Sequence, residues 1–225
     1  MTADPIHRLK PDLSFEIALW DQGIDRVAGV DEAGRGALAG PVCSAAVVLP
    51  ADASVISHLD GVRDSKMMTS GQRTYWAEVI QDVAIGFGIG FASAEEIDQV
   101  RIVRATHLAA FRAMQQLPEF PNHMILDYIF LPEVDLPQTA LVKGDARCLS
   151  VACASVLAKT ARDELMIRMH DQYPDYGFAS HKGYGTGAHR QVIREQGYCH
   201  EHRKSFSLKE LDQQDFLEEL FENVE

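Results

Sequence analysis

The sequence predicts an α/β fold in which a central mixed β-sheet is flanked by helices and followed by a short C-terminal helical segment. Short apolar segments typical of strands alternate with longer segments of helical periodicity along most of the 225 residues. The chain is also 46% hydrophobic, and a chain of this length and composition can bury one substantial core. We therefore expect one domain over residues 1–206 and an acidic helical tail over 207–225.

The first half of the chain is expected to supply three strands and two helices. Apolar runs predict strands near 26–31, 42–49 and 83–92, with a polar loop over 58–70. Helical spacing predicts helices over about 70–81 and 94–117. The second of these follows Ser93 with Glu96 three residues later, which is a capping-box pattern.

The second half is expected to add two short strands and then mainly helices. HMILD ends at Asp127 and TALVK ends at Lys143, so both strands finish on a charged residue. The remaining segments are an alanine-rich helix over about 148–171, an irregular loop over 173–187, a helix over about 187–196 and an acidic helix over about 208–222. The loop is aromatic, basic and glycine-rich, which is typical of a binding loop.

Composition excludes several functional classes. No apolar run reaches the roughly 18 to 20 residues of a membrane span, and the N-terminus lacks the hydrophobic stretch of a signal peptide. We therefore expect a soluble, cytoplasmic protein without membrane contact. The four cysteines have no CxxC spacing, which predicts reduced thiols rather than disulfides or a zinc site.

The formal net charge of −12 argues at first against a nucleic-acid partner. The charge is unevenly distributed, however. Residues 143–204 hold ten Lys or Arg against seven Asp or Glu, a local +3, whereas residues 205–225 hold one Lys against seven acids, a local −6. A polyanion can therefore meet a locally basic face, with the weak, salt-sensitive binding that such a balance predicts.

The most informative segment is VAGVDEAGRGALAGPV over residues 27–42. An apolar run ends in Asp31 and Glu32, which offer hard oxygen ligands for Mg²⁺ or Mn²⁺. The triplet Gly34, Arg35 and Gly36 follows, and its glycines allow a phosphate or sugar to approach backbone N–H groups. An acidic pair before glycine is also an ordinary way to leave a strand. Both side chains can serve one site only if the strand ends or bulges here.

Two further acids favour the functional interpretation. Asp127 ends one strand, and Asp145 follows shortly after the next. Four neighbouring carboxylates repel one another, so such a cluster needs divalent cations. A two-metal site for in-line phosphoryl transfer meets that need.

Seven segments together resemble a known family, the bacterial ribonuclease HII or type 2 ribonuclease H. The segments are VAGVDEAGRGALAGPV, DSK at 64–66, EEID at 95–98, LVKGDAR at 141–147, ASVLAKTARD at 154–163, HKGYGT at 181–186 and HRKSF at 202–206. They occur in the family's order over most of the chain. The first segment and the lysine-glycine-aspartate motif are highly specific.

The resemblance implies a ribonuclease H-like fold and an endonuclease. Such an enzyme hydrolyses the phosphodiester 5′ to a ribonucleotide in duplex DNA, including a single embedded ribonucleotide, and the RNA strand of RNA–DNA hybrids. It leaves 5′-phosphate and 3′-hydroxyl ends and serves ribonucleotide removal in DNA repair and replication. By position, Asp31, Glu32, Asp127 and Asp145 match the family's catalytic, metal-binding acids. Two Mg²⁺ or Mn²⁺ ions are expected, and no organic cofactor.

The resemblance also implies substrate-binding residues. The triplet Gly34, Arg35 and Gly36 matches the backbone that contacts the 2′-hydroxyl, and Tyr184 matches the tyrosine that stacks on the sugar next to the ribonucleotide. Candidates for phosphate contacts are Ser65, Lys66, Lys143 and Lys182, although a lone lysine is more often merely solvated.

Other interpretations remain open at this point. Asp163 beside Arg162 is interpreted as a structural ion pair and not as a fifth catalytic acid. A ribonuclease HIII, a non-catalytic nucleic-acid binder and a metal-dependent hydrolase of a small phosphorylated molecule are the alternatives to ribonuclease HII. The acidic tail is expected to pack on the domain, with docking of a replication or repair protein as the alternative. We expect a monomer.

Overall fold

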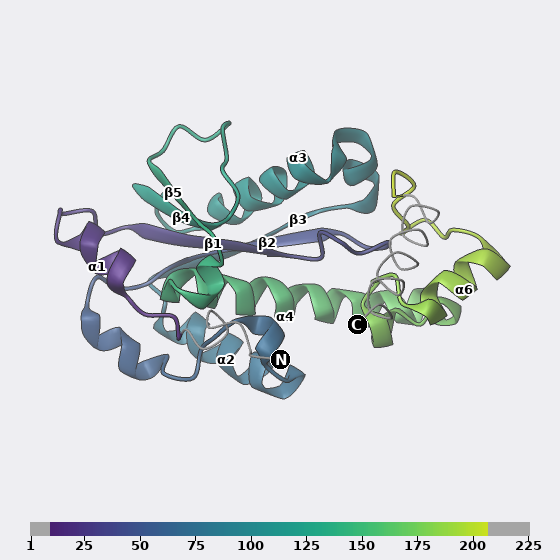
Figure 1. Cartoon of the computed structure of the whole chain (residues 1–225), viewed down its shortest axis with the longest axis horizontal. Helices are drawn as coiled ribbons and strands as arrows, with labels where there is room; N and C mark the ends of the chain where they lie inside the picture. Colours follow the sequence, from purple (N-terminus) through teal and green to yellow (C-terminus); the bar gives the residue numbers. More distant parts are fainter. Residues whose placement is uncertain (1–9, 207–225) are drawn as a thin grey trace, which may run out of the picture.

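The computed structural model describes residues 10–206, and a five-stranded sheet forms its centre (Figure 1). The strands are β1 (Val27–Ala33), β2 (Val42–Val48), β3 (Gly86–Ala92), β4 (His123–Asp127) and β5 (Gln138–Leu141). They lie in the order β3-β2-β1-β4-β5. β2 is antiparallel to β1 and β3, whereas β4 is parallel to β1 and β5. The predicted mixed sheet is confirmed.

Helices cover both faces of this sheet (Figure 1). α3 (Ala94–Met114) lies on one face, and α2 (Ser70–Val83) and α4 (Leu149–Gln172) lie on the other. The short α5 (Phe178–His181) and α6 (Gly187–Gln196) lie beyond one end of the sheet. Because both faces are covered, every residue of β1 except Glu32 is buried.

The structure corrects several predicted boundaries. A first helix, α1 (Ser14–Trp20), was not predicted, and the supposed loops over 58–70 and 173–187 contain short helical turns, among them Ser65–Met67, Pro174–Tyr176 and α5. β5 ends at Leu141 and not at Lys143, because Lys143 has a left-handed backbone conformation with φ +55° that ends the strand. The capping box of Ser93 and Glu96 is confirmed.

One glycine brings the central strand against the longest helix. A Cβ atom on Gly29 would lie 2.2 Å from the backbone carbon of Ser150, so only glycine allows β1 and the start of α4 to approach this closely. The contact places α4 directly beneath the strand that carries Asp31 and Glu32.

Three other predictions concern the whole chain. Within residues 10–206, no helix combines the length and the apolar character that crossing a membrane requires. Cys43, Cys148, Cys153 and Cys199 are free thiols, as predicted. The helix predicted over 208–222 lies outside the described residues.

Candidate active site

Four acidic side chains come together from three elements. Asp31 and Glu32 lie in β1, Asp127 is the last residue of β4, and Asp145 lies in the short turn Gly144–Ala146 after β5. β4 pairs with β1 only as far as Val30, so beyond that residue β1 has a strand partner on its β2 side alone. The turn that carries Asp145 and the end of β4 lie at this step in the sheet.

The strand does not end at the acidic pair, as we had expected, but runs on to Ala33. Asp31 and Glu32 are therefore neighbours in a regular strand. Even so, both carboxyl groups lie close enough to Asp127 for its charge to raise their pKa values. The step beyond β4 leaves this end of β1 without a strand partner on the β4 side, where we had expected the strand to end or bulge.

Asp31 is deeply buried, with 4% of its surface exposed, the same fraction as for Asp145. Its Oδ1 accepts a hydrogen bond of 2.7 Å from the backbone amide of Glu32, and the Ser155 hydroxyl is near enough to lower the pKa of the carboxyl group. Ser155 Oγ lies 2.9 Å from Ser65 Oγ. Burial raises the pKa of Asp31 well above its usual range, and repulsion from Glu32 and Asp127 adds to this.

The other three acids each have one protein partner. Arg35 Nη1 lies 3.2 Å from Glu32 Oε1, the amide of Gly144 donates to Asp127 Oδ1 at 2.6 Å, and Lys66 Nζ lies 3.6 Å from Asp145 Oδ2. Burial nevertheless raises the pKa values of all three carboxyl groups. A site that makes four carboxylates harder to ionise is a site that a divalent cation would stabilise.

The donor set fits a divalent metal ion. Glu32 Oε2 is buried and has no hydrogen-bond partner, which leaves one carboxylate oxygen unsatisfied beside the other acids. Among residues 10–206, no three His, Cys, Asp or Glu side chains already form a cluster that could hold a metal ion. Two of the acids are paired with cations of the protein instead, Glu32 with Arg35 and Asp145 with Lys66.

The triplet Gly34, Arg35 and Gly36 directly follows β1 and is held from inside the protein by Arg203. The Arg203 guanidinium donates to the carbonyl oxygens of Gly34 and Arg35, both at 2.8 Å. In a trans peptide the N–H points opposite to the C=O, so the amides of Arg35 and Gly36 point away from Arg203. Neither amide donates a hydrogen bond to another described residue. Two backbone donors are thus presented beside Glu32.

Gly34 allows a second buried arginine to lie against the triplet. It has φ +90°, and a Cβ atom here would lie 1.9 Å from Arg162 Nε. The Arg162 guanidinium donates to the carbonyl oxygens of Ala39, Pro41 and Lys182, and it therefore joins the segment after β1 to the HKGYGT segment.

Tyr184 lies next to the triplet, although about 150 residues separate them in the sequence. It forms an isolated β-bridge with Ala37. The Arg162 guanidinium carbon and Lys159 Nζ each lie 5.4 Å from the centre of its ring, within the range of cation–π contacts. The structure thus brings together the two segments for which the resemblance implies contact with a sugar.

A chain of neutral histidines supports the backbone of Tyr184. His189 Nδ1 lies 2.9 Å from the Tyr184 carbonyl oxygen, so this nitrogen carries the proton. His202 Nδ1 accepts from the Cys199 amide at 3.0 Å, which leaves the proton on its Nε2, 3.1 Å from His189 Nε2. Burial lowers the pKa values of His189 and His202 to about 4, in agreement with two neutral rings.

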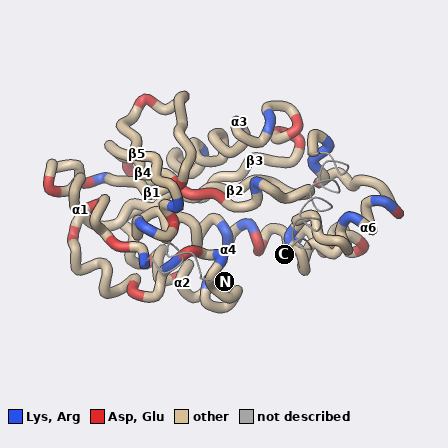
Figure 2. The backbone as a smooth tube through the Cα atoms, in the orientation of Figure 1, with Lys and Arg blue, Asp and Glu red and all other residues tan. Residues whose placement is uncertain are grey.

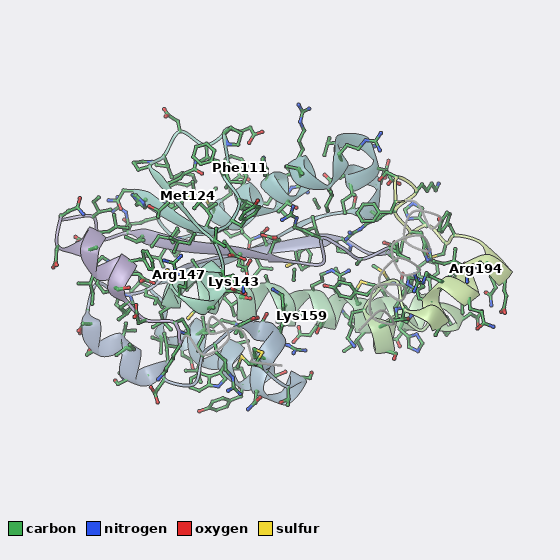
Figure 3. The ribbon with its side chains drawn as sticks, in the orientation of Figure 1. Phe111, Met124, Lys143, Arg147, Lys159 and Arg194 are labelled. Atoms are coloured by element: carbon green, nitrogen blue, oxygen red, sulfur yellow. The ribbon has the colours of Figure 1, made fainter. Side chains whose placement is uncertain are left out.

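The predicted phosphate contacts lie in different settings. Lys66 is 75% exposed beside Asp145, and Lys182 Nζ donates to the carbonyl oxygen of Ala179 in its own loop. Lys143 lies at the junction of the sheet with the start of α4 (Figure 3). Ser65 is buried, with 3% of its surface exposed, and its hydroxyl oxygen lies within hydrogen-bond distance of the Ser155 hydroxyl. Figure 2 shows basic segments next to the acidic part of β1.

Sequence reasoning kept one acid, Asp163, outside this group. Asp163 forms ion pairs with Arg73 Nη2 at 3.0 Å and Lys159 Nζ at 2.7 Å, as a structural residue would. It missed Ser155, because a serine in an alanine-rich helix gives no signal of its own. The structure also shows that Arg203, in the HRKSF segment, holds the triplet.

The fold and the acidic site define a class of protein, the nucleases of the ribonuclease H type. The structure is similar to the crystal structure of ribonuclease H2 from Pyrococcus horikoshii OT3, with a TM-score of 0.66 and 25% sequence identity over 80% of this chain and 93% of that one. It also shares its fold with Bst-RNase HIII in complex with Mn²⁺, with a TM-score of 0.59, 17% identity and coverage of 91% and 71%.

Sequence comparison narrows the class to one family. The family model for ribonuclease HII matches residues 28–209. Ribonuclease HII of Synechococcus sp. (strain JA-3-3Ab) is 51% identical over 204 residues, which are 88% of this chain and 89% of the relative. The chain therefore belongs to the ribonuclease HII family, and it is a nuclease, a hydrolase of phosphodiester bonds.

Proposed function

We propose that this enzyme hydrolyses the phosphodiester 5′ to a ribonucleotide in duplex DNA, at single embedded ribonucleotides and RNA–DNA junctions, and also cuts the RNA strand of RNA–DNA hybrids. The products carry 5′-phosphate and 3′-hydroxyl ends. One observation carries the proposal: Arg203 and Arg162 fix the triplet and Tyr184 against each other, directly beside the four acids. A group that reads a sugar thus lies next to a group suited to phosphoryl transfer.

The four acids Asp31, Glu32, Asp127 and Asp145 would hold two Mg²⁺ or Mn²⁺ ions. When bound, such ions lower the pKa of a water molecule and stabilise the charge on the leaving 3′ oxygen. The protein's own contribution is position. The bonds from the Glu32 amide to Asp31 and from the Gly144 amide to Asp127 fix two of the carboxylates in the backbone frame. The Mn²⁺ bound to Bst-RNase HIII supports this choice of metal.

The triplet would recognise the ribose. Its two outward amides, those of Arg35 and Gly36, are donors suited to a 2′-hydroxyl, which is the group that distinguishes RNA from DNA. Tyr184 would pack on the sugar of the neighbouring nucleotide. Because Arg162 contacts both segments, the two would act as one rigid unit.

Cations near the acids would contact the phosphates. Lys66 with its exposed side chain, together with Lys143, Lys182 and the hydroxyl of Ser65, remains our set of candidates. The local positive charge predicted from the sequence supports the proposal that the acidic chain binds a polyanion at this face.

The alternatives receive less support. Membership of the ribonuclease HII family disfavours ribonuclease HIII, and the preserved acids disfavour a non-catalytic binder. A hydrolase of small phosphorylated molecules would leave the triplet and Tyr184 without a sugar in a duplex to recognise. The domain boundary at residue 206, a cytoplasmic location, a monomeric state and a repair partner for residues 207–225 remain proposals.

A metal titration tests the proposal. Wild-type enzyme, Asp127→Asn and the control Asp82→Asn, an exposed acid on α2, are assayed on a hybrid with increasing Mg²⁺ or Mn²⁺. We expect cleavage to need the metal and Asp127→Asn to lower turnover at least about 10³-fold, roughly 4 kcal/mol in the barrier. Asp127→Asn activity above a tenth of wild type at saturating metal would contradict the proposed role of this acid.

A further inference from the structure

Tyr128 directly follows Asp127 and has an unusual backbone conformation. Its φ is +60°, a value that bulky residues rarely adopt. The amide of Ile129 donates to the Asp127 carbonyl oxygen at 2.6 Å and closes a three-residue turn with Tyr128 at its centre. Turns of this hand are rare and strained.

Core packing explains why the chain turns after Asp127, but it does not explain why the residue at the turn is a tyrosine. The turn directs Ile129 and Leu131 into the core beneath α3, so the chain has to bend directly after Asp127. Glycine would make the same bend without strain. The Tyr128 side chain adds little packing in return, since 73% of its surface is exposed. Strain without packing, directly beside an acidic site, points to a functional role.

The ring lies in a cleft that continues from the acids. The cleft has a volume of about 760 Å³, and Asp127 and Asp145 form part of its lining. Two other exposed apolar side chains, Met67 and Val142, line it together with Tyr128. Four cations also line it, Lys10, Arg63, Lys66 and Lys143, together with the acids Asp60 and Asp64, and Lys10 pairs with Asp60. Apolar side chains interleaved with cations are typical of surfaces that contact both sugars and phosphates of a nucleic acid.

We infer that the Tyr128 ring packs on the sugar of a nucleotide that flanks the scissile phosphate, in this cleft and apart from the sugar contact proposed for Tyr184. The occupant is a sugar rather than a base because bases in a duplex stay stacked, whereas the minor groove of a hybrid is wide and shallow and displays the sugars. The inference rests on the proposed function, since it takes the strand that crosses the four acids as the occupant. Tyr128 would be a substrate-positioning residue.

Replacement of the ring by glycine separates binding from folding. Tyr128→Gly relieves the positive φ, so we expect a melting temperature equal to wild type or up to about 3 °C higher. Affinity for a duplex with one ribonucleotide, measured by fluorescence anisotropy in EDTA, should fall at least about 5-fold, and kcat/KM should fall with it. Tyr128→Phe should keep most of the affinity. The control Tyr75→Ala, which removes an exposed ring on α2 outside the cleft, should leave the affinity unchanged.

Modified duplexes identify the contacted group. An abasic nucleotide keeps the sugar and removes the base, whereas a propanediol spacer removes both. Each replaces one nucleotide at a time on either side of the ribonucleotide. At one position, the spacer should abolish the difference in affinity between wild type and Tyr128→Gly, and the abasic nucleotide should preserve it. A difference that is already lost with the abasic nucleotide would overturn the sugar contact in favour of the base.

Two further outcomes would decide against the inference. If Tyr128→Gly binds and cuts every duplex as wild type does, the ring has no role in substrate binding. If Tyr128→Gly is less stable than wild type and loses affinity equally on all modified duplexes, the residue acts through folding. Neither outcome affects the proposed function, which depends on whether the wild-type enzyme cuts specifically at ribonucleotides.

Discussion

The Arg203 guanidinium bonds to the carbonyl oxygen of Gly34 at 2.8 Å and links the end of the described chain to the segment that follows the central strand. The same side chain bonds to Arg35 and Gly40, and 1% of the residue is exposed. Burial and the nearby Arg162 lower the pKa of Arg203 to about 9, which leaves it charged at neutral pH. A charged fork held by three carbonyl oxygens is a rigid support for the triplet.

This geometry predicts that Arg203→Lys weakens ribonucleotide recognition. Lysine keeps the charge but lacks the planar fork, so it cannot hold the Gly34 and Arg35 carbonyl oxygens together. We expect kcat/KM on a single embedded ribonucleotide to fall at least about 10-fold, about 1.4 kcal/mol, while the metal requirement stays unchanged. Steady-state cleavage measures this, with Arg104→Lys on the exposed side of α3 as the control. Wild-type kcat/KM in a folded Arg203→Lys enzyme would remove this role.

We predict that the four acids lower the stability of the metal-free protein and that bound metal restores it. The pKa of Asp31 is higher in the folded state than in the unfolded state. The free energy of unfolding therefore falls as the pH rises from the unfolded-state pKa to the folded-state pKa. At pH 7, Asp31→Asn should therefore melt at a higher temperature than wild type without metal. Added Mg²⁺ or Mn²⁺ should raise the melting temperature of wild type more than that of Asp31→Asn. Calorimetry measures both, and equal metal responses would exclude Asp31 as a ligand.

We predict that removal of the Tyr184 ring impairs substrate positioning but not metal binding. Tyr184→Ala should lower kcat/KM on a single ribonucleotide about 10- to 100-fold, roughly 1.4 to 2.7 kcal/mol, because the ring would no longer pack on the sugar. Tyr184→Phe should retain most of the activity if stacking dominates. Cleavage of matched duplexes, with folding checked by thermal melting, decides the matter. A well-folded alanine variant with wild-type kcat/KM would show that Tyr184 has no role in positioning the substrate.

The histidine chain predicts a pH dependence of stability. His189 and His202 have folded-state pKa values of about 4, below the ordinary value of 6.5, so the unfolded state binds more protons between these limits. Their contribution to stability is complete above pH 6.5 and is lost as pH falls towards 4, at about 1.4 kcal/mol per pH unit for each histidine. The acids with raised pKa values change the stability in the opposite direction, because they make the fold more stable as the pH falls. A comparison between variants is therefore needed.

Chemical denaturation of His189→Gln between pH 7 and 5 isolates the effect. The slope of the unfolding free energy against pH reports how many more protons the unfolded state binds than the folded state. Removal of one titrating ring should lower this number by about one, which flattens the slope. Substitution of His58, an exposed histidine, by glutamine serves as the control and should leave the slope unchanged. An unchanged slope in His189→Gln would mean that the ring is already protonated in the folded protein.

The sequence predicted the mixed sheet because most strands are apolar runs and the helices have helical spacing, with a capping box at the start of α3. It also predicted that Asp127 ends a strand, since this acid follows an apolar run directly, but not that β1 runs past Asp31 and Glu32 to Ala33. It could not predict the support of the site. Arg203 and Gly34 lie far apart in the chain, and nothing in either local sequence indicates the partner. The left-handed backbone of Lys143 and Tyr128 also arises from tertiary packing, which overrides local propensity.

The most direct test of the central claim is strand-specific cleavage of a DNA duplex that contains one ribonucleotide, with the cut mapped at single-nucleotide resolution. An identical all-DNA duplex is the control, and both are assayed with and without Mg²⁺ or Mn²⁺. We predict one metal-dependent nick on the 5′ side of the ribonucleotide, with a 3′-hydroxyl and a 5′-phosphate, and no nick in the control. Equal cleavage of both duplexes, or no cleavage of the ribonucleotide-containing strand, would contradict the account.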